Sequence, residues 1–379
     1  MQKSVGQRTV SILGGGQLGR MFIQEAINYN ITTRVLDPDP QAPCSSICNE
    51  FVNGSFKDHD EVMKFGEGTD VLTVEIEHVN VDALEKLQQA GVKVYPQPSV
   101  LRVVQDKGVQ KQFYRDNGIP TSEFVLVESK DEIKGCGISL PAMQKLRTSG
   151  YDGRGVKALR SEADVDDAFE SPSVIEKMVD FEREISVIIS RNPSGEIASF
   201  PVVDMEFNPE ANLVEFLISP SGVSEDVKKK ATEIARKLIT SLDMVGILAV
   251  EMFVTRSGDV LVNEMAPRPH NSGHQTIEGN TTSQYASHLR AILDLPPGDT
   301  SVIKPAVMVN LLGEKGHNGP AVYDGIEDVL RIPGAYIHLY GKAVTKPFRK
   351  MGHVTVVAET VDDAKQKAVN IQSALKVVT

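Results

Sequence analysis

The sequence predicts a mixed α/β and α+β protein of several domains, with an open parallel α/β sheet at its N-terminus and a small β-rich domain at its C-terminus. Three observations support this fold class. The chain has 379 residues, more than the about 100–200 of a usual single domain. Its first hundred residues alternate strand and helix signals, and strand-rich segments follow. The 41% hydrophobic content is ordinary for a protein with a packed core.

The N-terminal region alternates apolar, β-branched runs with amphipathic segments. Strands are expected at 9–13, 32–37, 70–79 and 92–96. Helices are expected at 17–30 and 81–91. Such alternation indicates parallel βα units in one open sheet. A helix-rich stretch at 99–118 closes the region, because Gly118 and Pro120 form a helix stop signal.

The rest of the chain is richer in strands. The first of them are expected at 122–127, 140–146, 156–160 and 173–179. Those that follow are expected at 183–190, 197–207 and 212–220, before a helix at 224–243, a hairpin at 246–265 and a helix at 283–295. The tail holds short strands at 305–313, 335–342 and 352–359 and a helix at 362–375. Boundaries near 103, 185 and 300 then give the segments 1–103, 104–185, 186–300 and 301–379.

The composition excludes several classes of protein. A net charge of −11 argues against a general nucleic-acid surface, which needs a basic footprint. No run approaches the about 20 apolar residues that cross a bilayer, and the first residues lack the apolar core of a signal peptide. The three cysteines have no metal-ligand spacing. We therefore expect a cytoplasmic protein that acts on small molecules, without nucleic-acid or membrane partners.

An acidic hairpin that contains Glu251 and Glu264 is the most specific chemical feature. The turn signal RSGD lies between two β-rich runs. If Ser257 and Gly258 form a two-residue turn, Glu251 and Glu264 lie directly opposite on one face, where like charges are destabilising unless a cation lies between them. Carboxylates are preferred ligands of Mg²⁺, which in turn binds nucleotide phosphates. The alternative is that both carboxylates lie on a solvated sheet face.

The segment that follows the hairpin concentrates polar side chains in a loop. Residues 266–274 have the sequence APRPHNSGH, which is too rich in Pro and Gly for a helix. Loops at strand ends commonly carry function. His270 and His274 could be zinc ligands, but no third ligand has a matching spacing, so contact with a substrate is the favoured interpretation. An ordinary surface loop is the alternative.

Two further segments suggest a nucleotide site. A glycine-rich stretch at 147–155 lies between two expected strands, so it does not fit a Walker loop, which needs a strand-to-helix context. Its backbone N–H groups suit a flap over phosphates, with Lys145 upstream to neutralise them, although an ordinary turn is the alternative. The strand at 173–179 and Glu184 suit an adenine edge and a ribose hydroxyl, although acidic residues there are commonly solvated.

The N-terminal glycines fit a dinucleotide fingerprint. Gly14–Gly19 follows a strand with the pattern Gly-x-Gly-x-x-Gly, and Asp37 lies eighteen residues beyond it. A NAD-dependent dehydrogenase is therefore the strongest rival interpretation. The same turn can also seat a single phosphate at a helix N-terminus. Glu75, Glu77 and His78 are expected at the same carboxyl edge of the sheet, where ligands of open α/β sheets bind.

A basic loop interrupts the otherwise acidic tail. It contains Lys342, Lys346, Arg349, Lys350 and His353, between two short expected strands. A solvated run of charges is one interpretation. A phosphate-bearing substrate is the other, since it would give a reason for concentrating positive charge there.

Taken in order, these motifs resemble those of the ATP-grasp enzymes, and more narrowly the N5-carboxyaminoimidazole ribonucleotide synthase family of purine biosynthesis. The matching segments are GGGQLGRM at 14–21, EIEHV at 75–79, YDGRG at 151–155, VNEMAPRPHNSGH at 262–274 and GK…RKMGH at 342–353. The resemblance spans essentially the whole chain. It implies an ATP-grasp architecture of two lobes behind an N-terminal pre-ATP-grasp domain, and it implies a homodimer.

The resemblance also implies a ligase reaction. ATP would phosphorylate bicarbonate to carboxyphosphate, and the exocyclic amine of aminoimidazole ribonucleotide would be carboxylated, with release of ADP and phosphate. Phosphoryl transfer of this kind needs positioning and charge neutralisation more than a protein nucleophile. A formate-dependent glycinamide ribonucleotide transformylase and a non-catalytic nucleotide sensor are further alternatives. Some eukaryotic relatives carry a fused carboxylase domain that this sequence does not include, so only the synthase step is expected.

Residue roles follow from position in the matching motifs. ATP would be held by Lys107, Lys145, Gly150, Tyr151, Asp152, Gly153, Arg154, Gly155, Val156, Glu176, Lys177, Val179, Glu184, Asn263 and Glu264. Mg²⁺ (or Mn²⁺) would be bound by Glu251 and Glu264. The catalytic residues would be Asp152 at the substrate amine, with Arg268, Asn271 and His274 around the bicarbonate. The ribonucleotide would contact Gly16, Gln17, Leu18, Glu75, Glu77, His78, Lys342, Arg349 and Lys350. One position departs from the family pattern, because Phe207 stands where many members have a nucleotide-contacting His.

Overall fold

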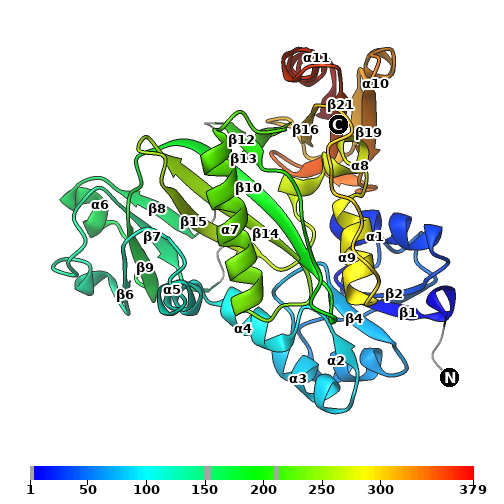
Figure 1. Cartoon of the computed structure of the whole chain (residues 1–379), viewed down its shortest axis with the longest axis horizontal. Helices are drawn as coiled ribbons and strands as arrows, with labels where there is room; N and C mark the ends of the chain where they lie inside the picture. The colour runs from blue at the N-terminus through cyan, green and yellow to red at the C-terminus, as the bar shows by residue number, and fades with distance from the viewer. Residues whose placement is uncertain (1–3, 149–154, 209–212) are drawn as a thin grey trace.

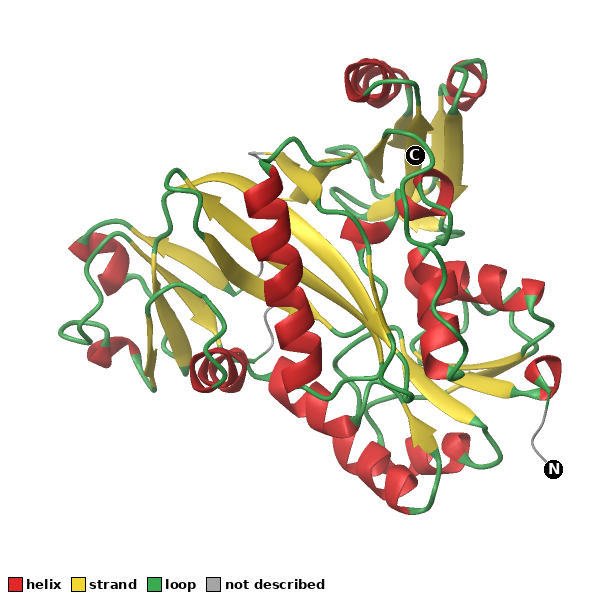
Figure 2. Ribbon diagram, in the orientation of Figure 1, coloured by secondary structure: helices red, strands yellow, loops and turns green. Residues whose placement is uncertain are grey.

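The computed structural model describes residues 4–148, 155–208 and 213–379 of the chain. It contains a parallel sheet at the N-terminus, a small antiparallel sheet, and a large sheet that continues into the C-terminal region (Figure 1). Figure 2 shows one long helix lying across the large sheet and shorter helices beside the N-terminal sheet. The predicted mixed α/β and α+β class is confirmed. None of the described helices is long and apolar enough to cross a membrane.

The N-terminal sheet has five parallel strands in the order β3-β2-β1-β4-β5. The strands are β1 (Thr9–Leu13), β2 (Thr32–Asp37), β3 (Glu50–Asn53), β4 (Val71–Val74) and β5 (Lys93–Val94). The connecting helices are α1 (Gln17–Asn28), α2 (His59–Gly66) and α3 (Val81–Gln89). The strand order reverses between β1 and β4, and open sheets of this kind bind ligands at the carboxyl edge of such a switch point.

Two expectations for this region are corrected. The strand expected to reach residue 79 ends at Val74. Glu75 N still donates a hydrogen bond to Leu13 O (2.8 Å), and the chain then turns away from the sheet. The acidic segment 75–79 is therefore a loop at the carboxyl edge of the sheet. β3 and α2 were absent from the expected elements, since both are short and their apolar patterns are weak.

α4 (Pro98–Gln105) and α5 (Lys107–Asp116) lead into the small lobe. Asp106 separates them, because its carboxylate caps α5 by accepting hydrogen bonds from the N–H groups of Gly108 and Val109. The small sheet is antiparallel, in the order β6-β9-β7-β8. Its elements are β6 (Phe124–Val127), β7 (Ala142–Leu146), β8 (Val156–Leu159), α6 (Glu162–Asp166) and β9 (Ser173–Lys177).

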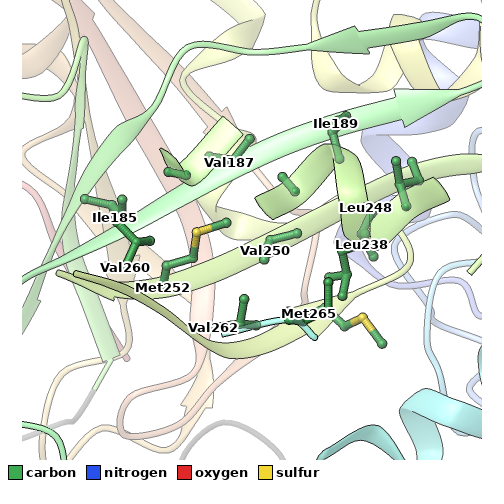
Figure 3. Packing of buried hydrophobic residues seen from close by; sticks show 14 of the residues in the cluster. Ile185, Val187, Ile189, Leu238, Leu248, Val250, Met252, Val260, Val262 and Met265 are labelled. Carbon is green, nitrogen blue, oxygen red and sulfur yellow. The ribbon is translucent and has the colours of Figure 1, made fainter. Parts of the chain in front are cut away.

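The large sheet has nine strands, in the order β15-β14-β10-β12-β13-β16-β21-β19, with β11 paired to β10. They are β10 (Phe181–Arg191), β11 (Ile197–Ser199), β12 (Val203–Asn208), β13 (Leu213–Ser219), β14 (Gly246–Thr255), β15 (Val260–Ala266), β16 (Ala306–Leu312), β19 (Ala335–Leu339) and β21 (Lys350–Val357). Apolar side chains of β10, β14 and β15 pack against α7 (Glu225–Ser241) in one buried cluster (Figure 3). One face of this part of the sheet is therefore buried against α7.

The C-terminal strands β16, β21 and β19 extend the large sheet, so the β-rich tail shares a sheet with the region before it. α11 (Val361–Ala374) packs on these strands in a separate cluster. α9 (Gln284–Ile292) packs against both α1 and β14, which joins the N-terminal sheet to the large one. The remaining elements are α8 (Thr276–Gly279), α10 (Ile326–Leu330), β17 (Gly319–Pro320), β18 (Val322–Asp324), β20 (Val344–Thr345) and β22 (Lys376–Val378). The division into four segments stays a prediction.

Candidate active site

The hairpin of β14 and β15 places Glu251 and Glu264 directly opposite one another, as predicted. The predicted two-residue turn is nevertheless wrong, because a three-residue loop at 256–258 joins the strands. That loop shifts the register by one residue. A bulge at Asn263 shifts it back, since it sets two residues of β15 against one of β14. The two departures cancel at the glutamate pair.

Glu251 lies on the face of the sheet that points away from α7. Val250 and Met252, on either side of it, point into the core on the α7 side (Figure 3), and alternate residues of a strand face opposite sides. Because of the bulge, Asn263 and Glu264 both oppose Glu251. Three oxygen-bearing side chains therefore come together on one face.

Two lysines from the α5 and β7 side of the molecule reach this face. Lys107, the first residue of α5, places its Nζ 3.1 Å from Glu264 Oε2. Lys145 of β7 donates from its Nζ to Asn263 Oδ1 at 2.9 Å. These contacts hold the small lobe against the hairpin. They also bring two positive charges to a place where they could neutralise nucleotide phosphates.

The two glutamates differ in charge state. The Lys107 ammonium group beside Glu264 holds the pKa of that carboxyl well below its usual range. Burial, together with the negative charges of Glu264 and Glu184, raises the pKa of Glu251 above its usual range. A cation bound between the carboxylates would favour the ionised form of both.

The donor set of the hairpin fits Mg²⁺. Two carboxylates and the Asn263 amide oxygen are hard oxygen ligands, and Mg²⁺ commonly completes its shell with substrate phosphates and water. In the described part of the chain, no group of three or more His, Cys, Asp or Glu side chains could hold a metal ion.

Glu176 of β9 is buried between two ammonium groups. Its Oε1 lies 3.2 Å from Lys145 Nζ, and its Oε2 lies 3.0 Å from Lys111 Nζ. Although burial opposes its ionisation, these two lysines lower the pKa of Glu176 to about 2. Its carboxylate is thus paired with two lysines inside the protein, and the expected contact of Glu176 with ATP stays a prediction.

The connection from β9 to β10 crosses between the two sheets. β9 ends at Lys177, two residues before the expected end, and Val179 lies in the connecting segment. Glu184 follows on β10, where burial raises its pKa to about 7. The expected contacts of this connection and of Glu184 with a nucleoside stay a prediction.

The polar loop after β15 is tied to three parts of the molecule. Arg268 Nη2 lies 2.7 Å from Glu77 Oε1 at the edge of the N-terminal sheet. His270 Nδ1 lies 3.5 Å from Glu251 Oε1, beside the metal carboxylates. Asn271 exchanges two hydrogen bonds with Asn310 of β16, at 2.9 and 3.0 Å.

His274 lies in the interior, with 1% of its surface exposed. Its Nδ1 contacts Gln284 Nε2 at 3.0 Å and Tyr285 Oη at 3.2 Å, and its ring stacks on His353 with centroids 4.7 Å apart. Burial holds the pKa of His274 well below its usual value, so the ring is neutral. Among the histidines of this loop, His270 therefore lies at the hairpin and His274 packs behind it.

The N-terminal glycine turn is occupied by the protein's own carboxylates. Glu75 Oε1 accepts a hydrogen bond from Leu18 N (3.2 Å), and a Cβ on Gly16 would lie 2.3 Å from that oxygen. Asp37 Oδ2 accepts from Gly15 N (2.7 Å). Backbone N–H groups that would bind a pyrophosphate are thus engaged, which disfavours the dinucleotide interpretation.

Glu75 connects the glycine turn to the other loops. Burial raises its pKa to about 7, while the positive charges of Arg268 and Lys342 favour its ionised form. Glu77 is bound to Arg268, and His78 is partly buried nearby in the same loop. The carboxyl edge of the N-terminal sheet therefore faces the loops of the other two regions.

The basic segment differs in part from the expected loop. Lys350 and His353 lie on β21, and His353 is fully buried between His338 and His274, so the prediction that both belong to the loop is wrong. Lys342 Nζ donates to Lys350 O (2.7 Å), with the ammonium group 5.6 Å from the Tyr340 ring centre. Arg349 Nη1 donates to Val344 O (2.6 Å).

The expected glycine flap falls mostly outside the described residues. This applies to Gly150, Tyr151, Asp152, Gly153 and Arg154. β7 and β8 on either side of it pair antiparallel, with Lys145 opposite Val156, as expected for a hairpin. Gly155 closes its base, since its carbonyl accepts a hydrogen bond from Leu146 N (2.8 Å).

Three family models match successive parts of the chain. Residues 7–105 match the ribonucleotide synthetase preATP-grasp domain, and residues 112–285 match the ATP-grasp domain. Residues 306–367 match the phosphoribosylaminoimidazole carboxylase C-terminal domain. The predicted ATP-grasp architecture, with its N-terminal pre-ATP-grasp domain and its C-terminal domain, is confirmed.

Curated proteins are similar along the whole chain. It is 39% identical over 377 residues to the phosphoribosylaminoimidazole carboxylase of Saccharomyces cerevisiae, with 95% of this chain and 65% of that protein covered. The chain thus spans about two thirds of the length of that relative. It is 36% identical over 369 residues to the N5-carboxyaminoimidazole ribonucleotide synthase of Bacillus subtilis, with 95% of this chain and 94% of that protein covered.

Solved structures agree with this similarity. The N5-carboxyaminoimidazole ribonucleotide synthetase of Thermotoga maritima is 41% identical with a TM-score of 0.91, covering 98% of this chain and 100% of that one. The Aspergillus clavatus synthase, solved with ADP and 5-aminoimidazole ribonucleotide, is 35% identical with a TM-score of 0.89, covering 98% and 99%.

Proposed function

The chain belongs to the N5-carboxyaminoimidazole ribonucleotide synthase family of ATP-grasp enzymes, and we propose that it is the ATP-dependent ligase that carboxylates 5-aminoimidazole ribonucleotide with bicarbonate. The products are N5-carboxyaminoimidazole ribonucleotide, ADP and phosphate, formed through carboxyphosphate in purine biosynthesis. One observation carries the proposal. Glu251 and Glu264 face each other between two lysines on one side and a polar, cationic loop on the other.

The nucleotide side of the site is built for phosphoryl transfer. Lys107 and Lys145 neutralise the phosphates, and the segment around Val179 and Glu184 holds the nucleoside. Mg²⁺, bound by Glu251 and Glu264 with Asn263 beside it, would supply charge neutralisation at the transferred phosphoryl group. ATP binding is supported by relatives solved with ATP or ADP. The flap residues Gly150 to Val156, with Lys177, complete the proposed nucleotide site.

The acceptor side is built for bicarbonate. Arg268 is oriented by Glu77, and His270 and Asn271 follow on the same loop. We assign the bicarbonate to Arg268, His270 and Asn271, with His274 as a buried support for the loop and not as a contact. Excluding water here protects the carboxyphosphate from hydrolysis. Asp152, on the flap, is the proposed partner of the substrate amine.

The ribonucleotide would lie between the N-terminal sheet and the basic segment. Lys342, Arg349 and Lys350 supply positive charge for its 5′-phosphate. The proposed contacts on the opposite side are Gly16, Gln17, Leu18, Glu75, Glu77 and His78. The positive charges of Lys342 and Arg268 act on Glu75, which supports one binding site for both groups of residues.

The experiment measures phosphate release from Mg·ATP in the presence of bicarbonate. We expect strong stimulation by 5-aminoimidazole ribonucleotide and none by glycinamide ribonucleotide with formate. Stimulation by the second pair alone would identify the related transformylase. Slow release that no substrate stimulates would identify a nucleotide sensor. A cytoplasmic location and a homodimer are further proposals, which cell fractionation and analytical ultracentrifugation would test.

A further inference from the structure

Lys111 of α5 is a buried lysine that lies outside the proposed ATP, metal, bicarbonate and ribonucleotide contacts. Its side chain is 3% exposed. Its ammonium group lies 2.6 Å from Thr121 Oγ1, 3.2 Å from Ser122 Oγ and 3.0 Å from Glu176 Oε2. An ammonium group has three N–H bonds, so each of them has an acceptor. Lys111 is therefore held in one position as a charged group inside the protein.

The acceptors of Lys111 lead to the nucleotide site by two routes. Thr121 Oγ1 donates to Val262 O (2.7 Å). Val262 lies on β15 directly before the bulge at Asn263, which is followed by the proposed metal ligand Glu264. Ser122 Oγ donates to Glu176 Oε2 (2.6 Å), and the other oxygen of Glu176 faces Lys145. The two routes meet again where Lys145 contacts the bulge.

We propose that Lys111 is a positioning residue for ATP, which fixes Glu176 so that Lys145 is shared between Glu176 and Asn263. One carboxylate between two ammonium groups neutralises neither of them fully, so Lys145 keeps charge for the nucleotide phosphates. Without Lys111, Glu176 would pair fully with Lys145 and draw it away from Asn263. This inference rests on the nucleotide part of the proposed function and not on the identity of the ribonucleotide.

The charge of Lys111 gives an independent readout. The charged and titratable groups around it are Glu176, Lys145, Lys107 and Tyr114. Burial outweighs the attraction of Glu176 and lowers the pKa of Lys111 to about 8. Relative to a variant in which residue 111 does not titrate, the affinity of the wild type for nucleotide should therefore fall as the pH rises through about 8.

The test is calorimetric binding of Mg·ADP to Lys111→Met and to a matched control, Lys237→Met. Lys237 also contacts the segment after α5, donating to Gly118 O (2.8 Å), but it is exposed and lies outside the two routes. We expect Lys111→Met to weaken binding at pH 7 by about tenfold or more, with the control unchanged. The KM for ATP should rise in parallel, while the KM for aminoimidazole ribonucleotide at saturating ATP should stay within about twofold.

A second variant keeps the test decisive if Lys111→Met folds poorly. Ser122→Ala removes only the hydroxyl between Lys111 and Glu176, and should weaken Mg·ADP binding about fivefold. Wild-type affinity in both variants, or a lower melting temperature with unchanged affinity, would overturn the proposal. If the ribonucleotide fails to stimulate phosphate release while these variants lose Mg·ADP, the proposed function fails and the role of Lys111 stands.

Discussion

Arg268 Nη2 lies 2.7 Å from Glu77 Oε1, and this ion pair joins the loop after β15 to the loop after β4. Both side chains are largely shielded from solvent, with 18% and 15% of their surface exposed. An arginine of the large lobe is therefore held against the carboxyl edge of the N-terminal sheet. The position of its guanidinium group therefore depends on a residue far away in the sequence.

Replacing Glu77 by Gln should lower kcat/KM for bicarbonate by about ten- to a hundredfold. Arg268 would lose the charge that fixes it, and a misplaced binding group costs much of its contribution to catalysis. Steady-state kinetics with varied bicarbonate would measure the effect. Glu85→Gln, which removes a partner of the surface residue Arg102, is the control. Unchanged dependence on bicarbonate in Glu77→Gln would contradict the role of Arg268.

The glutamate pair shows why part of the site could be predicted from the sequence. Strand pairing within a hairpin is local, so a turn signal and a count of residues bring Glu251 and Glu264 close together, and they lie directly opposite because the longer loop and the bulge shift the register in opposite directions. The same count missed both the longer loop and the bulge at Asn263. Only the bulge explains why Asn263 shares the face of the glutamates.

Contacts between distant segments could not be predicted from the sequence. The pairing of Arg268 with Glu77 and the ring of contacts around Lys111 depend on how the sheets pack, for which periodicity gives no signal. His353 was counted with the basic loop because charges precede it in the sequence, although the strand expected at 352–359 contains it, and it is fully buried on β21. The β-branched run GHVTVV, in which His353 lies, was the one feature of the sequence that could have predicted its burial.

Glu251→Gln and Glu264→Gln should change stability in opposite directions. Gln at 251 removes a buried carboxyl that faces a like charge, so the melting temperature of the metal-free protein should rise. Gln at 264 leaves Lys107 without its closest counter-ion, so the melting temperature should fall. Both variants lose a proposed metal ligand, and kcat should fall about a hundredfold or more.

The stabilisation by Glu251→Gln should grow with pH. The folded-state pKa of Glu251 is raised above its usual value, so the folded state binds more protons than the unfolded state above about pH 4.5. The wild-type protein therefore loses stability as the pH rises toward that raised pKa, and the Gln variant lacks this loss. Melting curves at pH 6 and 8 would measure the difference. An equal decrease in melting temperature for both variants would contradict the opposed charge states.

Lys342→Ala should raise the KM for the ribonucleotide by about ten- to a hundredfold while the KM for ATP stays within about twofold. Charge-assisted bonds to a phosphate contribute more than neutral ones, and Lys342 lies far along the chain from the proposed ATP residues. Initial rates with each substrate varied in turn would separate the two constants. Lys346→Ala, an exposed lysine of the same segment, is the control. A change confined to the KM for ATP would refute the phosphate assignment.

The stability of the protein should fall in acid because of buried neutral histidines, of which His288 is the clearest case. Its Nε2 lies 3.1 Å from Thr73 Oγ1, its ring packs edge-on against Phe22, and burial lowers its pKa to about 3. Below about pH 6.5 the unfolded state takes up a proton that the folded state excludes, so the free energy of unfolding falls with pH down to about 3. Each such histidine contributes a slope of up to about 1.4 kcal/mol per pH unit.

His288→Gln should remove that part of the slope, whatever it does to the absolute stability. Urea denaturation between pH 4 and 7 would give the free energy of unfolding at each pH for the variant and the wild type. His59→Gln is the control, because His59 lies at the surface beside Asp60 and Lys86. Buried His274 and His353 are also held neutral, so a reduced slope should persist in His288→Gln. Equal slopes in the wild type and His288→Gln would mean that His288 is protonated in the folded protein.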